Sequence, residues 1–164
     1  MRTIATVLLT VQFAIAQAPS PAIAAAQAFY DWYVPLSKVR STTSPVQKAL
    51  TQRRDLFAAS LAAALQQDLD AQKKVTDDIV GLDFDPFLSS QDPCERYTAG
   101  PATTKGTVIL VEVHGICAGK RRAKADLTAE MSQQNGKWIF NDFLYPDGSR
   151  LTGVLALLKK DRQR

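Results

Sequence analysis

The feature that most limits the possible folds is a change in the spacing of apolar residues along the chain. Before residue 76, apolar side chains recur at the intervals of three and four residues that are typical of amphipathic helices. From residue 108 they form a continuous run and then alternate with polar side chains, as β-strands do. Helices followed by an antiparallel meander and a closing helix predict an α+β fold, with the helices on one face of the sheet.

The strongest signal in the second half is a β-hairpin. Residues 123–131 alternate cleanly, Asn135-Gly136 predicts a two-residue turn, and residues 138–145 form the returning strand. Residues 108–113 are expected to be a central strand, and residues 97–103 a weaker one that leads into a turn at Lys105-Gly106. We therefore expect a four-stranded antiparallel sheet.

Capping residues and prolines predict where the helices begin and end. One helix is expected at residues 22–33 and is stopped by Pro35, and a second stripe runs from Ser44-Pro45 to Lys74 with a break near Arg53. Residues 76–91 are expected to be irregular, with apolar anchors at Leu82, Phe84, Phe87 and Leu88. Residues 151–158 predict a short amphipathic C-terminal helix.

The N-terminus has the pattern of a cleavable signal peptide. Met1-Arg2 is positively charged, residues 3–13 are apolar, and small residues follow. We expect residues 1–16 to be the signal peptide, with cleavage after Ala16 or Ala18, and residues 22–164 to form a single domain. The apolar segment is shorter than the roughly 20 residues that span a bilayer, although a buried N-terminal helix is an alternative. The expected location is the periplasm or the exterior, with no transmembrane segment in the mature chain.

Charge gives little indication of a partner. Apart from Arg2, residues 1–16 carry no charge, so the mature chain has 19 basic and 16 acidic residues and a net charge of +3. The excess lies in residues 120–124 and 159–164. A solvated turn and a helix C-terminus explain these positions best, while anionic lipid or wall polymer remains an alternative. With an export signal, nucleic acid is not expected as a partner.

The two cysteines, Cys94 and Cys117, are expected to form one disulfide in an exported protein. Neither follows the apolar N-terminal segment, so there is no cysteine for N-terminal lipidation. Counting outward from a Lys105-Gly106 turn places Cys94 directly opposite Cys117, with Cα atoms about 5.5 Å apart. A bulge near Gly115 would ease the bridge at this position.

Metal and cofactor sites are not predicted. The aspartates at 77, 78, 83, 85 and 92 lack the spacing of a calcium loop, so capping and turn roles are favoured over a divalent cation. The single histidine, His114, excludes a histidine-rich site. Glu112 and His114 share a strand face and could form an acid–base pair, but Val111 and Val113 match the apolar side of residues 125–131 better. We expect Glu112 and His114 to lie outside the core.

Asp142 is the most informative carboxylate. Counting from the Asn135-Gly136 turn pairs Phe140 with Met131 and Asp142 with Ala129, which places Asp142 on the apolar face. A carboxylate there must be partnered, be protonated or line a wet cavity. Either it pairs with a helix hydroxyl or a backbone amide, or it binds a ligand. The candidate binding residues are Asp142, Trp138, Phe140 and Trp32.

Three segments resemble a known family. They are Ala28 to Tyr33, Leu82 to Asp92 and Trp138 to Tyr145, and together they resemble domain-of-unknown-function family 3828, whose members are small bacterial envelope proteins and in many cases lipoproteins. The resemblance covers residues 22–158. It implies a cone-like fold similar to the nuclear-transport-factor-like superfamily, with helices packed over a curved antiparallel sheet. It brings no catalytic residues. The chain departs from the lipoprotein members in lacking the lipidated cysteine.

No Ser/His/Asp set, glycine-rich phosphate loop or paired-cysteine zinc signature is present in the sequence. We therefore expect a non-enzymatic periplasmic binding or interaction domain without a cofactor, whose partner is an unknown envelope protein or a small molecule. One alternative is an envelope inhibitor or immunity protein that blocks a secreted enzyme through its acidic loop. Another is a small enzyme that uses a pocket around Asp142.

Overall fold

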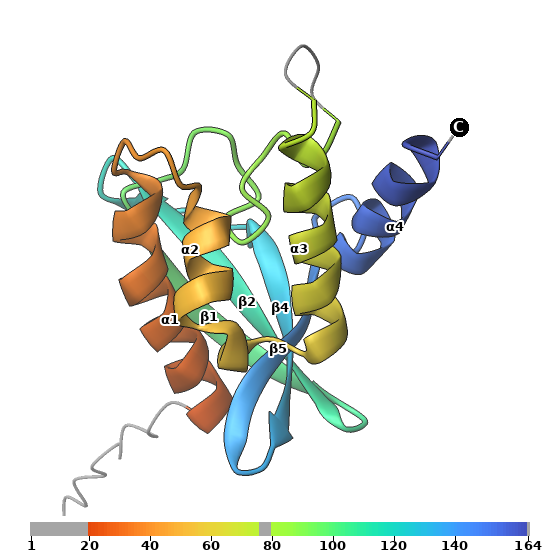
Figure 1. Ribbon diagram of the computed structural model, residues 1–164. Helices are drawn as coiled ribbons and strands as arrows, with labels where there is room; N and C mark the ends of the chain where they lie inside the picture. The colour runs from red at the N-terminus through yellow and green to blue at the C-terminus, as the bar shows by residue number, and fades with distance from the viewer. Residues whose placement is uncertain (1–19, 76–79, 164) are drawn as a thin grey trace, which may run out of the picture.

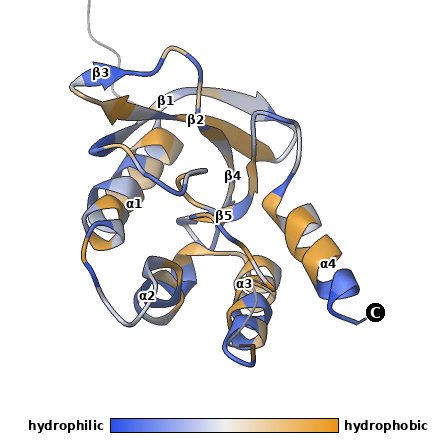
Figure 2. Ribbon diagram, turned by 90° about the horizontal axis from the view of Figure 1, so that it is seen from above, coloured by the Kyte–Doolittle hydropathy of each residue, from blue (hydrophilic) through white to orange (hydrophobic). Residues whose placement is uncertain are grey.

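Three helices cover one face of an antiparallel sheet in the computed structural model, which describes residues 20–75 and 80–163 (Figures 1 and 2). These three are α1 (Pro21–Ser37), α2 (Pro45–Gln52) and α3 (Ala59–Gln72). The other helices are the short 3₁₀ helix η1 (Arg54–Leu56) and α4 (Leu151–Asp161). The strands are β1 (Arg96–Lys105), β2 (Val108–Cys117), β3 (Lys120–Arg121), β4 (Leu127–Gln134) and β5 (Lys137–Leu144). The α+β prediction is confirmed. The expected signal peptide, Asp77 and Asp78 lie outside the described residues.

The sheet has the order β1-β2-β4-β5, with β3 paired to the end of β2. Five strands thus replace the four that we expected, because the two-residue β3 carries too little sequence to show a pattern. The predicted hairpin is confirmed: Gln134 pairs with Lys137, and Asn135 and Gly136 have positive φ values of 49° and 77°. Two consecutive left-handed residues form the type I′ turn that Asn-Gly favours. α1, α2 and α3 lie in a row beneath this sheet in Figure 2, whereas α4 lies apart from that row, against α3 and β5.

Helix starts follow the predicted capping pattern. The side chains of Ser20 and Ser44 accept hydrogen bonds from the first turns of α1 and α2, and a proline follows each serine. The expected break at Arg53 is confirmed by its φ of −139°, which ends α2. The expected stop at Pro35 is wrong, since α1 continues to Ser37. Pro35 lies in the last turn, where its missing N–H removes only one hydrogen bond of the helix.

Aromatic rings fill the space between the helices and the sheet. Phe29 on α1 has its ring centroid 4.9 Å from that of Phe140 on β5 and 5.6 Å from that of Phe87. Phe57 and Phe143 complete the cluster, and all five side chains are at most 5% exposed. The core between the helices and the sheet is therefore packed with side chains.

The irregular segment 81–94 is built into this core by tyrosine hydroxyls. Tyr33 donates to the carboxylate of Asp85 at 2.8 Å, and Tyr145 donates to the Pro86 carbonyl at 3.0 Å. Tyr97 donates to the carbonyl of Leu88 at 3.3 Å. Phe87 and Leu88 are fully buried, and Leu82 and Phe84 pack against the core, as predicted for the anchors of this segment. The segment is thus irregular in backbone but fixed at several points.

The register of β1 against β2 differs from the expected one. Lys105 pairs with Val108, so the turn residues are Gly106 and Thr107 rather than Lys105 and Gly106. The register shifts again between Ala99 and Ala102, which places the irregularity at Gly100-Pro101 and not at Gly115. Pro101 cannot donate a ladder hydrogen bond, and such a residue is tolerated where an edge strand is irregular.

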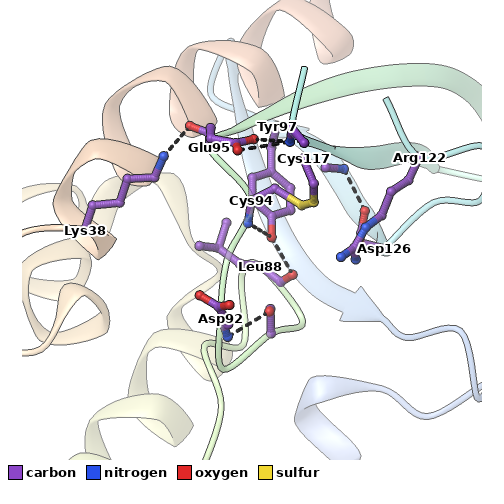
Figure 3. The surroundings of a disulfide bond; sticks show 12 residues. Lys38, Leu88, Asp92, Cys94, Glu95, Tyr97, Cys117, Arg122 and Asp126 are labelled. Atoms are coloured by element: carbon purple, nitrogen blue, oxygen red, sulfur yellow. Dashed lines mark hydrogen bonds and ion pairs between the residues drawn. A yellow bond between two sulfur atoms is a disulfide. The ribbon is translucent and has the colours of Figure 1, made fainter. Parts of the chain in front are cut away.

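The predicted disulfide between Cys94 and Cys117 is confirmed (Figure 3). Cys94 lies just before β1 and Cys117 ends β2, so the two residues are not the direct cross-strand pair that we expected. Their Cα atoms are nevertheless 4.7 Å apart, which is within bridging range. Gly115 makes room for the bridge, because a Cβ atom at this position would lie 2.6 Å from the Cys94 sulfur.

Replacing both cysteines by alanine should lower the free energy of unfolding by roughly 3 kcal/mol, because the bridge closes a loop in the unfolded chain and thereby lowers the entropy of that chain. The two cysteines are 23 residues apart. Urea denaturation of the oxidised protein and of the double variant measures the difference. A reductant should destabilise the wild type and leave the double variant unchanged. Equal stability of the oxidised protein and the variant would contradict this account.

Candidate functional site

The structure places Asp142 on the other face of the sheet from the one predicted. Phe140 pairs with Met131 as expected, but Asp142 pairs with Glu130 rather than Ala129, because the register shifts between these two pairs. The extra residue is Asn141. One inserted residue reverses the facing of everything beyond it. Asp142 therefore points away from the aromatic core.

Asp142 is nonetheless only 3% exposed, because the start of α4 covers it. Its carboxylate accepts hydrogen bonds from the Thr152 hydroxyl at 2.6 Å, the Thr152 amide at 3.1 Å and the Arg150 Nε at 2.9 Å. The amide of Phe143 adds a fourth bond at 2.9 Å. Thr152 thus supplies the helix hydroxyl and a backbone amide, the partners expected if Asp142 is a paired structural group and not a ligand-binding one. Asp142 thus anchors α4 to the sheet.

Substituting Asp142 by asparagine should lower the free energy of unfolding by about 1–3 kcal/mol, because an amide cannot accept from all four donors and lacks the charge that pairs with Arg150. Thermal and urea unfolding measure the loss. Asp92→Asn, at an exposed carboxylate, is the matched control and should be neutral. If the two variants were equally stable, Asp142 would not be the anchor described.

The four residues predicted as a binding site do not meet in one place. Phe140 is buried in the aromatic core, and Trp138, opposite Gln133 as predicted, packs at its margin. Trp32 lies on α1, where the guanidinium of Arg53 sits 5.4 Å from its ring centroid. Asp142, on the far face of the sheet, is thus separated from the three aromatic side chains.

Glu112 and His114 share the face opposite the core, as predicted, while Val111 and Val113 are fully buried on the core side. His114 is itself only 2% exposed, since the chain after β2 covers it. Its Nε2 lies 3.0 Å from a carboxylate oxygen of Glu112, and its Nδ1 lies 3.0 Å from the Arg122 carbonyl. The two ring nitrogens are thus each within hydrogen-bond distance of an oxygen atom of the same chain. This arrangement fastens residues 118–122 to the sheet.

A pocket of about 700 Å³ lies where four segments meet at one end of the helical layer. These segments are the end of α1, the start of α2, the second half of α3 and residues 82–93, which lie together at the top of Figure 1. Its wall is mainly apolar and includes Val46, Leu65, Leu69, Leu82 and Phe84. The sequence does not reveal this pocket, although the acidic residues of its segment 82–93 are visible there.

Asp85 provides the most unusual polar group of this pocket. Its carboxylate accepts from the Tyr33 hydroxyl at 2.8 Å and from the Phe87 amide at 3.0 Å, the turn role predicted for an aspartate here. Protein atoms surround most of the carboxylate, and this burial raises the pKa of Asp85 from 3.8 to about 6, against the opposing effect of hydrogen bonds from Tyr33, Phe87 and the Leu88 amide. Near neutral pH the side chain is therefore mainly ionised but poorly hydrated.

Asp68 contributes a second buried carboxylate to the same wall. It is 2% exposed and pairs with the Arg162 guanidinium at 2.6 Å. The side-chain amide of Gln72 and the backbone amide of Leu82 complete its hydrogen bonds. The Asp68 charge is thus compensated within the protein. Asp83, the third carboxylate of the pocket, is exposed.

The described part of the chain also bears on metal sites and on membrane-spanning helices. Within residues 20–75 and 80–163, no group of three or more histidine, cysteine, aspartate or glutamate side chains is placed to hold a metal ion. Helices in these same ranges are all too short or too polar to cross a bilayer. Neither a protein-family model, nor a curated protein, nor a solved structure matches the chain. The resemblance to family 3828 therefore stays a prediction.

Proposed function

We propose that this chain is a non-enzymatic binding domain of the periplasm or the exterior, and that it holds a small ligand in the pocket between α1, α2, α3 and residues 82–93. The observation that carries the proposal is the cavity itself. Its volume of about 700 Å³ is within the range of small-molecule sites, which combine apolar walls with a few polar groups. A cone-like fold similar to the nuclear-transport-factor-like superfamily is part of the proposal.

The other candidate places have less to support them. Aromatic side chains fill the space between the helices and the sheet. The carboxylate of Asp142 is occupied by four donors from its own chain. An enzyme built around Asp142 would need an accessible carboxylate, which these contacts do not offer. The pocket beside Asp85, in contrast, combines accessible volume with a carboxylate in an apolar wall.

Export is supported by the disulfide and by the pattern of residues 1–16. Disulfides form and persist in oxidising compartments such as the periplasm. The bridge joins Cys94, directly after the segment that walls the pocket, to the end of β2. Oxidation therefore supports the wall of the proposed site.

Blocking the pocket tests the proposal. Leu82→Trp places a large ring in the cavity, whereas Leu157→Trp adds the same ring at an exposed position on α4. Ligand-observed NMR with a fragment library should find compounds that bind the wild type and Leu157→Trp but not Leu82→Trp. A library without hits, or hits that bind all three proteins equally, would count against a ligand site here. Melting curves establish that both variants fold.

A second candidate, an inhibitor of a secreted enzyme, is favoured by the exposed aspartates of the same segment. Asp83 and Asp92 are exposed, and the segment between them is held by tyrosine hydroxyls and ends at the disulfide. A rigid acidic loop suits a protein partner because little ordering is needed on binding. Substituting Asp83 and Asp92 by asparagine would weaken such a complex, whereas Leu82→Trp would weaken the binding of a small ligand.

A further inference from the structure

We propose that the ligand of this pocket is an organic cation, a protonated amine attached to an apolar body, and that the carboxylate of Asp85 binds its ammonium group. This inference rests on the proposed function, because it names the ligand class for the same pocket. Three features of the pocket support it: the charges of its lining, the hydrogen bonds of Asp85 and the apolar wall.

The charges of the lining have one sign. Asp68, Asp83 and Asp85 all line the pocket, and among its described lining residues none is a lysine, arginine or histidine. Asp68 is compensated by Arg162, which approaches it at 2.6 Å. Asp83 and Asp85 take part in no ion pair with the residues that the structure describes. The pocket thus has uncompensated negative charge at its wall.

Asp85 has capacity for a further donor. An ionised carboxylate has about four acceptor positions, and the donors from Tyr33, Phe87 and Leu88 leave one of them for a ligand. A neutral or anionic ligand would displace water from this carboxylate and leave its charge without a partner, which is unfavourable in apolar surroundings. An ammonium group supplies both the donor and the opposite charge.

The remainder of the wall defines the rest of the ligand. Leu69, Leu82 and Phe84 line the pocket beside Asp85 and present apolar side chains. The last turn of α3, which ends at Gln72, also borders it, and a helix C-terminus favours a nearby cation. The N-terminus of α2 also borders the pocket, and a helix N-terminus disfavours a cation. Its first turn is, however, already capped, because the Ser44 side chain accepts a hydrogen bond from the Gln47 amide. A compact apolar body with one amine therefore fits the lining best.

Three compounds with the same indole body test the charge preference. Tryptamine carries an ammonium group, tryptophol a hydroxyl group and indole-3-propionate a carboxylate. Titration of the isotope-labelled protein at about pH 8, where primary amines are protonated and aspartates ionised, measures each affinity by NMR. Tryptamine should bind at least about tenfold more tightly than tryptophol, and indole-3-propionate should bind more weakly than either.

Asp85→Asn and Asp92→Asn separate the role of Asp85 from a general effect of acidic charge. Asp85→Asn should bind tryptophol as the wild type does, which shows that the pocket is intact, but should bind tryptamine no more tightly than tryptophol. Asp92→Asn, on the same segment, should keep the wild-type preference. Equal affinity of the wild type for tryptamine and tryptophol would overturn the inference while leaving a ligand pocket in place. Failure of all three compounds to bind would also overturn it, and the fragment experiment with Leu82→Trp then decides the proposed function separately.

Discussion

Replacing Phe29 by alanine should lower the free energy of unfolding by about 3–5 kcal/mol, the usual cost of removing a large aromatic side chain from a packed core. Phe29 is 2% exposed and contacts rings from α1, from the segment after α2, from residues 81–94 and from β5. No single neighbour can move into the vacated volume without losing its own contacts. We therefore expect the loss of stability to lie well above the lower end of this range.

Urea denaturation with tryptophan fluorescence measures this loss, and Val39→Ala, at an exposed position after α1, is the control. The control should change stability by less than about 0.5 kcal/mol. A loss below about 1 kcal/mol for Phe29→Ala would mean that the aromatic cluster is not the centre of the core. Filling the same site with Phe29→Leu should restore part of the stability, because less volume is lost.

The sequence predicted most of the elements because their signals are local. The Asn135-Gly136 turn, the alternation that buries Leu127, Ala129 and Met131, and the break at Arg53 each depend on neighbouring residues, and each is present. The end of α1 was missed for the opposite reason. A proline is tolerated in the last turn of a helix, and only the surrounding contacts decide how far that turn continues.

The facing of Asp142 could not follow from alternation alone. A regular strand through Phe140 would turn Asp142 inward and Phe143 outward, whereas the inserted Asn141 lets both phenylalanines face the core. The signal that could have revealed it is the pair of aromatic residues three positions apart, a spacing that a regular strand cannot place on one face.

The pocket could not be predicted from the sequence, for a related reason. Its wall combines α1, α2, α3 and residues 82–93, and no local pattern shows that these segments meet. The acidic residues were visible, but their partners were not. Only the fold shows that Asp68 is compensated by Arg162 while Asp85 is held by Tyr33. Which carboxylate can bind a ligand is therefore a property of the tertiary structure.

The Arg162–Asp68 pair leads to the last prediction. Arg162, at the end of α4, donates to Asp68 at 2.6 Å and to the Val80 carbonyl at 2.7 Å, so it joins α4, α3 and the start of the pocket segment. Replacing Arg162 by methionine keeps an unbranched apolar chain but leaves the 2% exposed Asp68 without its cation. Breaking a buried pair in this way costs about 3–5 kcal/mol.

The size of this loss depends on the unpaired charge, and a double variant tests that dependence. Lys160→Met, at an exposed position on α4, is the control for the loss of a positive charge and should be nearly neutral. Asp68→Asn combined with Arg162→Met should be more stable than Arg162→Met alone, because asparagine removes the buried charge and still accepts from the Leu82 amide. Urea denaturation of the four proteins decides the matter. If Arg162→Met were as stable as Lys160→Met, the pair would not be what fixes α4 against α3. The compensation of Asp68, which singles out Asp85 as the proposed binding carboxylate, would then have to be reconsidered.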